Sequence, residues 1–240
     1  MSLPQYSFLP LSHHSDYGFG ATADAFKEAA DDLSAAQVSG PRLNGHLATA
    51  YLYRHAIELY LKSMIVVLHR RLRIPFGSYS ADGEPCVVVE GQTKPFHRVH
   101  SVAKLFAYFH DLVNSQSDAL ETFCRTDWTA FPGEVRDWIK LIESTDPKST
   151  FFRYPDPQNR AGDHSKSSFQ ASTPQDIVAS ANLADKPIKA VVLVDESDSI
   201  VESYRFSADV LPELQAALRS LSDLLEAAHY GMRIELADGL

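Results

Sequence analysis

The stretch from Leu43 to Arg73 limits most strongly what this chain can fold into. Its apolar residues recur at helical spacing until Pro75 and Gly77 stop the pattern, so it predicts one helix of about eight turns at ~3.6 residues per turn. Apolar side chains fall on most of its circumference rather than on a single stripe. We therefore expect a central helix that other elements surround on most sides, as in a helical bundle.

Charged residues interrupt the apolar surface of this helix within the segment YLYRHAIELYLKSMI. At ~100° per residue, these side chains share one stripe about a quarter-turn wide. They are Arg54, His55, Glu58 and Lys62. One interpretation makes the stripe the solvent side of the helix, where residues four apart form weak ion pairs. The other places it in a cleft or a dimer seam, where the cations bind phosphate and the histidine moves a proton. Spacing leaves both open.

The rest of the chain also predicts helices, with little β structure. Helical patterns cover residues 19–37, 100–113, 132–145, 174–184 and 208–230, and Gly231 ends the last one. A hairpin is predicted from residues 190–195 to 199–206, and a smaller one within residues 78–96. The expected fold class is mainly α, as a single domain over residues 1–240. Its core helices fall within about 19–145, and the loop 146–173, the hairpin and the C-terminal helix follow.

Composition and charge argue against several classes of protein. No apolar run approaches the ~20 residues of a membrane span, and the N-terminus lacks the pattern of a signal peptide, so we expect a cytoplasmic protein without a membrane partner. Two cysteines, Cys86 and Cys124, do not suggest a disulfide framework. The net charge of −9 argues against nonspecific coating of nucleic acid. Nine basic and four acidic residues from Arg42 to His110 nevertheless direct any anionic ligand to that segment.

Three short motifs, in this order, resemble a widespread group of prokaryotic HEPN-like helical proteins. The motifs are LYRHAIELYLKSMI at residues 52–65, HSVAKLF at residues 100–106 and FRYP at residues 152–155. The resemblance covers roughly residues 42–160. It implies a HEPN-like up-and-down helical bundle, often a homodimer, of the kind linked to toxin–antitoxin modules, phage defence and the handling of RNA or nucleotides.

Many HEPN proteins are metal-independent ribonucleases, in which an arginine precedes a histidine with four to six residues between them. This pairing suits RNA cleavage, since arginine stabilises the charged phosphoryl transition state and histidine moves the proton of the 2′-hydroxyl. The motif is absent from this sequence: the nearest approaches, Arg42 to His46 and Arg160 to His164, have three residues between them. The usual ribonuclease pair is therefore not carried over to this chain.

The positions that match the three motifs form the candidate site, and we predict that six side chains converge there. The candidate catalytic residues are His55, His100 and Glu58, and the candidate phosphate or nucleic-acid ligands are Arg54, Lys62 and Arg153. In this hypothesis one of the two histidines is the general acid or base, and Glu58 orients the cations. Phe152 and Tyr154 either stack on a base or pack the loop onto the core.

Neither a cofactor nor a metal ion is expected. His97, His100 and His110 follow one another along the chain, but no Cys, Asp or Glu stands at the spacing of further ligands. The pair His110-Asp111 invites comparison with HD-type phosphohydrolases, which also need an earlier His and a later Asp. His69 and either Asp163 or Asp176 could be nominated, but nothing in the sequence around them supports that class.

The predicted function is that of a component of a prokaryotic defence or toxin–antitoxin system. It would act on or bind RNA or nucleotides, and the enzymatic form of the hypothesis is a metal-independent ribonuclease with a nonstandard site. The alternative is a noncatalytic HEPN-like module for dimerisation or for binding a partner. The expected partners are RNA or a nucleotide, a second copy of the chain, and a nucleotidyltransferase or an antitoxin.

Overall fold

The chain is mainly helical, as predicted. The computed structural model describes residue 6 and residues 8–39, 42–76, 83–156, 159–184 and 187–239. The α-helices in this part of the chain are α2 (Phe19–Ser39), α3 (Gly45–Arg71), α4 (Val102–Ser115), α5 (Ser117–Phe123), α6 (Glu134–Thr145), α7 (Arg160–Ser165), α8 (Pro174–Leu183) and α9 (Pro212–Ala237). Short 3₁₀ helices are η1 (Leu11–His13) and η2 (Phe96–Arg98). None of the described helices combines the length and the apolar character needed to cross a membrane.

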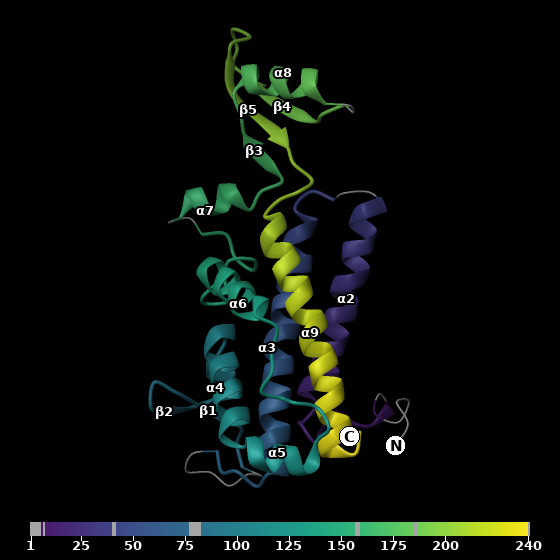
Figure 1. The fold of residues 1–240 in the computed structure, drawn as a ribbon. Helices are drawn as coiled ribbons and strands as arrows, with labels where there is room; N and C mark the ends of the chain where they lie inside the picture. The colour runs from purple at the N-terminus through teal and green to yellow at the C-terminus, as the bar shows by residue number, and fades with distance from the viewer. Residues whose placement is uncertain are drawn as a thin grey trace.

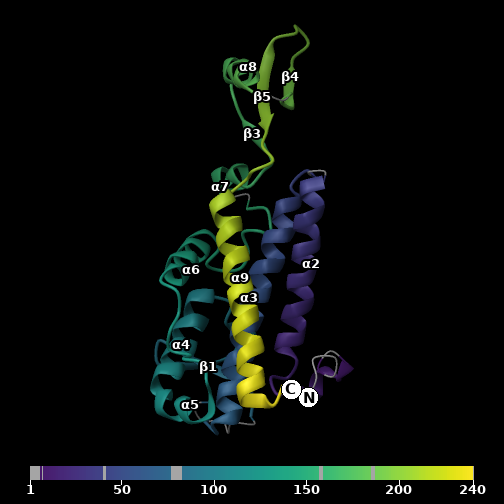
Figure 2. The same cartoon turned by 45° about the vertical axis from the view of Figure 1, so that its right-hand side comes forward.

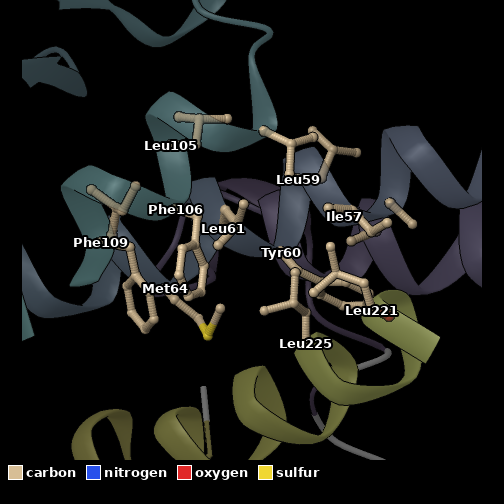
Figure 3. Close-up of a cluster of buried hydrophobic side chains, with 14 of the residues drawn as sticks. Ile57, Leu59, Tyr60, Leu61, Met64, Leu105, Phe106, Phe109, Leu221 and Leu225 are labelled. Atoms are coloured by element: carbon tan, nitrogen blue, oxygen red, sulfur yellow. The ribbon is translucent and has the colours of Figure 1, made fainter. Parts of the chain in front are cut away.

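Helix α3 is the centre of a bundle, and α2 and α9 run along it (Figures 1 and 2). Every residue from Ala56 to His69 is buried, which explains why the apolar side chains of α3 do not form a single stripe. Figure 3 shows the α3 side chain Met64 between Phe109 of α4 and Leu225 of α9. The predicted central helix is thereby confirmed.

Helix α4 packs on α3, and α6 packs on both α4 and α9. Both are amphipathic and bury one face, with Leu105 and Phe109 on α4 and Ile142 on α6. The Ser101 side chain caps α4 by accepting a hydrogen bond from the backbone N–H of Lys104 at 3.1 Å. The helix therefore starts after His100, which lies in the connecting segment and is free to turn toward α3.

A two-stranded hairpin precedes α4 and packs beside it. Its strands are β1 (Cys86–Val89) and β2 (Gln92–Pro95), paired antiparallel with Val89 opposite Gln92. The two turn residues, Glu90 and Gly91, have φ values of 54° and 75°, the left-handed backbone that a two-residue hairpin turn requires. The smaller predicted hairpin is confirmed at residues 86–95. Residues 77–82, including the predicted stop at Gly77, lie outside the described residues.

The described residues between 169 and 206 form an arm that extends beyond one end of the bundle (Figures 1 and 2). It contains α8 and an antiparallel sheet of order β3-β5-β4, made of β3 (Phe169–Ala171), β4 (Ala190–Val194) and β5 (Ile200–Phe206). The predicted hairpin corresponds to β4 and β5. The predicted loop 146–173 also contains α7 and β3, elements of six and three residues that are too short to show a period in the sequence.

Helix α9 continues past the predicted stop at Gly231 and ends at Ala237. A Cβ at Gly231 would lie 3.1 Å from Cη2 of Trp128, so this glycine allows an aromatic ring to approach the helix. The residues that follow α9, Asp238 and Gly239, have φ values of 53° and 82° and provide the left-handed termination instead.

Candidate functional site

Three charged side chains of α3 form a buried network. Arg54, Glu58 and Lys62 have relative exposures of 0%, 2% and 3%. The Lys62 ammonium donates to Glu58 Oε1 at 2.7 Å, and Arg54 Nη1 donates to Glu58 Oε2 at 3.4 Å. The spacing of four residues places all three on one face of α3. The interpretation of this stripe as the solvent side of the helix is therefore wrong.

The chain covers the stripe with two segments that are distant in sequence. Arg54 Nη2 donates to the backbone carbonyl of His100 at 2.8 Å and to that of Asp146 at 3.3 Å. Arg54 Nε lies 3.2 Å from Asp146 Oδ2, at an angle that makes this contact an ion pair rather than a hydrogen bond. The guanidinium thus joins α3 to the start of α4 and to the end of α6, which is how it can be fully buried.

His100 connects the buried network to the surface. Its Nδ1 lies 3.0 Å from Glu58 Oε1, yet 48% of its side chain is exposed. Burial raises the pKa of Glu58, but the ammonium of Lys62 and the imidazole of His100 outweigh it and hold the pKa below its ordinary value. The carboxylate can only accept, so we infer that Nδ1 carries a proton toward Glu58. The tautomer with its proton on Nδ1 leaves Nε2 as a hydrogen-bond acceptor.

A basic cavity of about 280 Å³ opens beside His100. It lies between the β1–β2 hairpin, the start of α4 and the loop after α6. Its basic lining residues are Lys94, Arg98, His100, Lys104 and Lys148. None of the described lining residues is acidic, and the nearby Glu90 pairs with Lys104 at 3.0 Å. The cavity therefore has the charge and the donors to hold a small anion such as phosphate.

His55 and Arg153 belong to a neighbouring aromatic cluster. Both contact Tyr51, which lies one turn before His55 on α3. The His55 ring stacks on Tyr51 at 5.7 Å between centroids and meets Phe26 of α2 edge-on at 4.6 Å. The Arg153 guanidinium carbon is 5.8 Å from the centroid of the same Tyr51 ring. Burial is the main cause that lowers the pKa of His55; Glu58 opposes it and the neighbouring cations add to it, so the ring is neutral at pH 7.

The FRYP segment is attached to the bundle through its backbone. The Lys166 ammonium donates to the carbonyls of Phe151 and Tyr154, both at 2.9 Å, and Asp146 Oδ1 accepts from the backbone N–H of Thr150. Phe152 is 9% exposed and packs in the core, whereas Tyr154 is 58% exposed. The alternative in which these aromatics pack the loop is thus correct for Phe152, while Tyr154 remains accessible.

Of the six predicted residues, four meet in one network: Arg54, Glu58, Lys62 and His100. Sequence reasoning missed Asp146, although its position between the end of a helix and Pro147 marks it as a helix-ending residue. It also missed four cationic residues that line the cavity, Lys94, Arg98, Lys104 and Lys148. The excess of basic residues between Arg42 and His110 was the available signal for the first three.

Metal ligation finds no support in the described residues, where no three His, Cys, Asp or Glu side chains stand close enough to hold an ion. Comparison with known proteins gives no match to this chain among family models, curated proteins or solved structures.

Proposed function

We propose that this protein is a HEPN-like module that binds the phosphate groups of RNA or a nucleotide in the basic cavity, with His100 as the proton-transferring residue. The observation that carries the proposal is the position of His100. One ring nitrogen is oriented by a buried carboxylate, and the other is available beside four cationic side chains. A histidine oriented by a carboxylate is a recurrent arrangement for general acid–base catalysis.

Each residue has a role that its exposure allows. Lys94, Arg98, Lys104 and Lys148 line the cavity and would contact phosphate. Arg54 and Lys62 are too buried to contact a polyanion, so in this proposal they hold Glu58 ionised and in place. Exposed Arg153, beside Tyr154, would contact a more distant phosphate or base of a longer RNA.

The reaction that fits these groups is metal-independent cleavage of RNA. Nε2 of His100 would take the proton of a 2′-hydroxyl, and the 2′-oxygen would attack the adjacent phosphorus. The bond to the 5′-oxygen would break, giving a 2′,3′-cyclic phosphate and a 5′-hydroxyl that takes its proton from solvent. The cavity cations would stabilise the added negative charge in the transition state, an effect worth ~2.7–4 kcal/mol per well-placed donor.

The test compares matched variants on labelled RNA in the presence of a chelator. We expect cleavage by the natural chain, loss of at least ~100-fold in rate for His100→Ala, and no change for His97→Ala. His97 is an exposed histidine three residues away and controls for loss of an imidazole. Equal rates for the natural chain and His100→Ala would refute the catalytic role.

Binding is tested separately, because the cavity can hold phosphate without catalysis. Lys94→Glu with Arg98→Glu should weaken RNA binding and reduce its dependence on salt, as expected when phosphate contacts are lost. Arg136→Glu with Lys140→Glu, the same charge change at two exposed residues of α6, is the control. Unchanged affinity in the double variant would exclude the cavity as the binding site.

A second candidate is a noncatalytic HEPN-like module. The observation in its favour is that three of the six candidate residues are buried and paired with one another, as in a purely structural network. In that case His100→Ala would lower thermal stability without affecting RNA. In either form we propose a role in prokaryotic defence or a toxin–antitoxin pair, and co-purification with a nucleotidyltransferase or an antitoxin would support it.

A further inference from the structure

Strand β4 is the most exposed apolar segment among the described elements of the arm. All five of its residues, Ala190–Val194, are exposed, and Val191, Val192, Leu193 and Val194 have relative exposures between 41% and 55%. Successive side chains of a strand point to opposite faces, so both faces of β4 are apolar and open. An exposed apolar edge strand readily pairs with another strand, and natural proteins generally protect such edges.

The free edge of β4 can be located residue by residue. In the described sheet β4 is at the edge and pairs with β5 alone. The carbonyl of Lys189 accepts from Phe206 N–H at 2.8 Å, and Asp195 N–H donates to the Ser199 carbonyl at 3.0 Å, so both residues direct these groups toward β5. Because the direction alternates along a strand, Ala190, Val192 and Val194 direct their N–H and C=O groups away from β5.

The charges that flank β4 identify the partner. The sequence KAVVLVD places Lys189 three residues before Val192 and Asp195 three residues after it, with no charged residue between them. In an antiparallel pair of identical strands centred on Val192, Lys189 of one copy lies opposite Asp195 of the other, and the reverse pair forms by symmetry. Like charges therefore do not face each other in this register.

The same register uses every outward backbone group of the strand. Val192 faces Val192 of the other copy, and Ala190 faces Val194. These are hydrogen-bonded positions, which gives about six interstrand hydrogen bonds. Lys189 and Asp195 then occupy a non-hydrogen-bonded position, where opposing side chains approach most closely. Charge, backbone direction and side-chain chemistry agree on one register.

We propose that two copies of this chain associate through β4 and form a continuous six-stranded antiparallel sheet, in which the two β4 strands lie at the centre. The association covers the apolar edge and joins two small sheets into one of ordinary size. Both charges are already held at the ends of the strand. The Lys189 ammonium lies 5.6 Å from the Phe206 ring centroid, and Asp195 Oδ1 accepts from Ser197 and Ser199.

The first test is the mass of the full chain in solution by sedimentation velocity over a range of concentrations. We expect a dimer that dissociates on dilution. Val192→Pro should give a monomer, because it removes an outward N–H and leaves the ladder to β5 intact. Val192→Lys should do the same, because it places two ammonium groups on the symmetry axis. Val178→Lys, at a 59% exposed apolar position on α8, is the matched control and should remain dimeric.

The second test reverses the charges. Lys189→Glu should raise the dissociation constant of the dimer about tenfold, and adding Asp195→Lys should recover much of the loss. Since Asp195→Lys also removes hydrogen bonds of the turn, the thermal midpoint of each variant is recorded to confirm folding. Hydrogen exchange supplies an independent readout: on raising the concentration, amides of Ala190, Val192 and Val194 should become protected, whereas those of Val191 and Leu193 should not change.

Several outcomes would overturn this proposal. A natural chain that stays monomeric at ~100 μM would exclude a stable β4 pair. A dimer that survives both Val192 variants would place the interface elsewhere. Concentration-dependent protection at Val191 and Leu193, rather than at the alternate residues, would contradict the direction of the strand. Failure of Lys189→Glu to weaken the dimer would exclude the register centred on Val192.

Discussion

Glu58 is a single buried carboxylate that Lys62, Arg54 and His100 share. Burying ions is costly, and replacing such a network with apolar side chains is often neutral for stability. The clearer effect of this network is to fix the positions of the chain segments that it joins. Arg54 bonds the His100 and Asp146 carbonyls, so the same guanidinium that neutralises Glu58 also sets where the cavity-lining segments lie.

Glu58→Gln should lower the free energy of unfolding by ~3–5 kcal/mol, because Lys62 stays buried without a counter-charge and Arg54 keeps only Asp146 as its counter-charge. Urea denaturation measures the change. Glu90→Gln removes the carboxylate of an exposed pair with Lys104 and should have a much smaller effect. Similar losses for the two variants would show that the network contributes no more than a surface ion pair.

His229 on α9 makes stability depend on pH. Burial lowers its pKa from 6.5 to about 4, although Asp16 Oδ2 lies 3.8 Å from its Nε2 and acts in the opposite direction. The unfolded chain therefore takes up the proton first. The contribution to stability is complete above pH 6.5 and is lost as the pH falls toward 4, with a slope of up to ~1.4 kcal/mol per pH unit.

His229→Gln should remove that part of the pH dependence of the unfolding free energy, measured by urea titrations between pH 4 and 7 as about one fewer proton bound on unfolding. The exposed His97→Gln is the control for loss of an imidazole. An unchanged slope in His229→Gln would mean that other groups account for the acid sensitivity.

Gly20 of α2 leaves room for the His229 ring of α9. A Cβ at Gly20 of α2 would lie 2.1 Å from His229 Nε2 and 2.8 Å from Asp16 Oδ2. This contact is far inside van der Waals distance, so α2 depends on this glycine to pack against α9. The backbone N–H of Gly20 also donates to Asp16 Oδ2 at 2.6 Å.

Gly20→Ala should destabilise the chain by about 3 kcal/mol, because overpacking outweighs the helix propensity gained, which is ~1 kcal/mol. Gly133→Ala is the control, since a Cβ there meets no atom within 4 Å. Thermal unfolding followed by circular dichroism compares them. A midpoint for Gly20→Ala equal to that of the control would show that α2 and α9 move apart at little cost.

At the scale of the whole molecule, the arm and the bundle meet at Ser168. Its backbone N–H donates to Asn44 Oδ1 at 2.7 Å, and its carbonyl accepts from Ser207 N–H at 2.8 Å. The two chain segments that enter and leave the arm are therefore hydrogen-bonded neighbours. The arm behaves as an insertion between α7 and α9 that the bundle core does not require, since the described arm residues lie outside the hydrophobic core cluster.

Replacing residues 169–206 with Gly-Gly should leave the bundle folded and remove dimerisation. The helical circular dichroism signal of the shortened chain should remain cooperative on heating, with a midpoint within a few degrees of the natural chain. Sedimentation velocity should give a monomer. Loss of cooperative unfolding would show that the arm contributes to the bundle after all.

The positions of the main helices and of both hairpins follow from the sequence because their signals are local. Periodicity, capping residues and turn residues act within a few positions of one another, as at Ser101 before α4 and at Glu90-Gly91 between β1 and β2. The predicted end of α9 at Gly231 is wrong because that glycine serves a contact with Trp128, which no local signal reveals.

The sequence by itself determined that this chain forms a mainly helical bundle and that Arg54, Glu58 and Lys62 share one face of its central helix. Only the tertiary structure decided what covers that face. Residues 100 and 146 lie 46 and 92 positions beyond Arg54, and they bury the charged network while leaving the His100 ring exposed at a basic cavity. Helical spacing records which side chains share a face. The neighbours of that face depend on contacts between distant segments, which a local pattern does not contain.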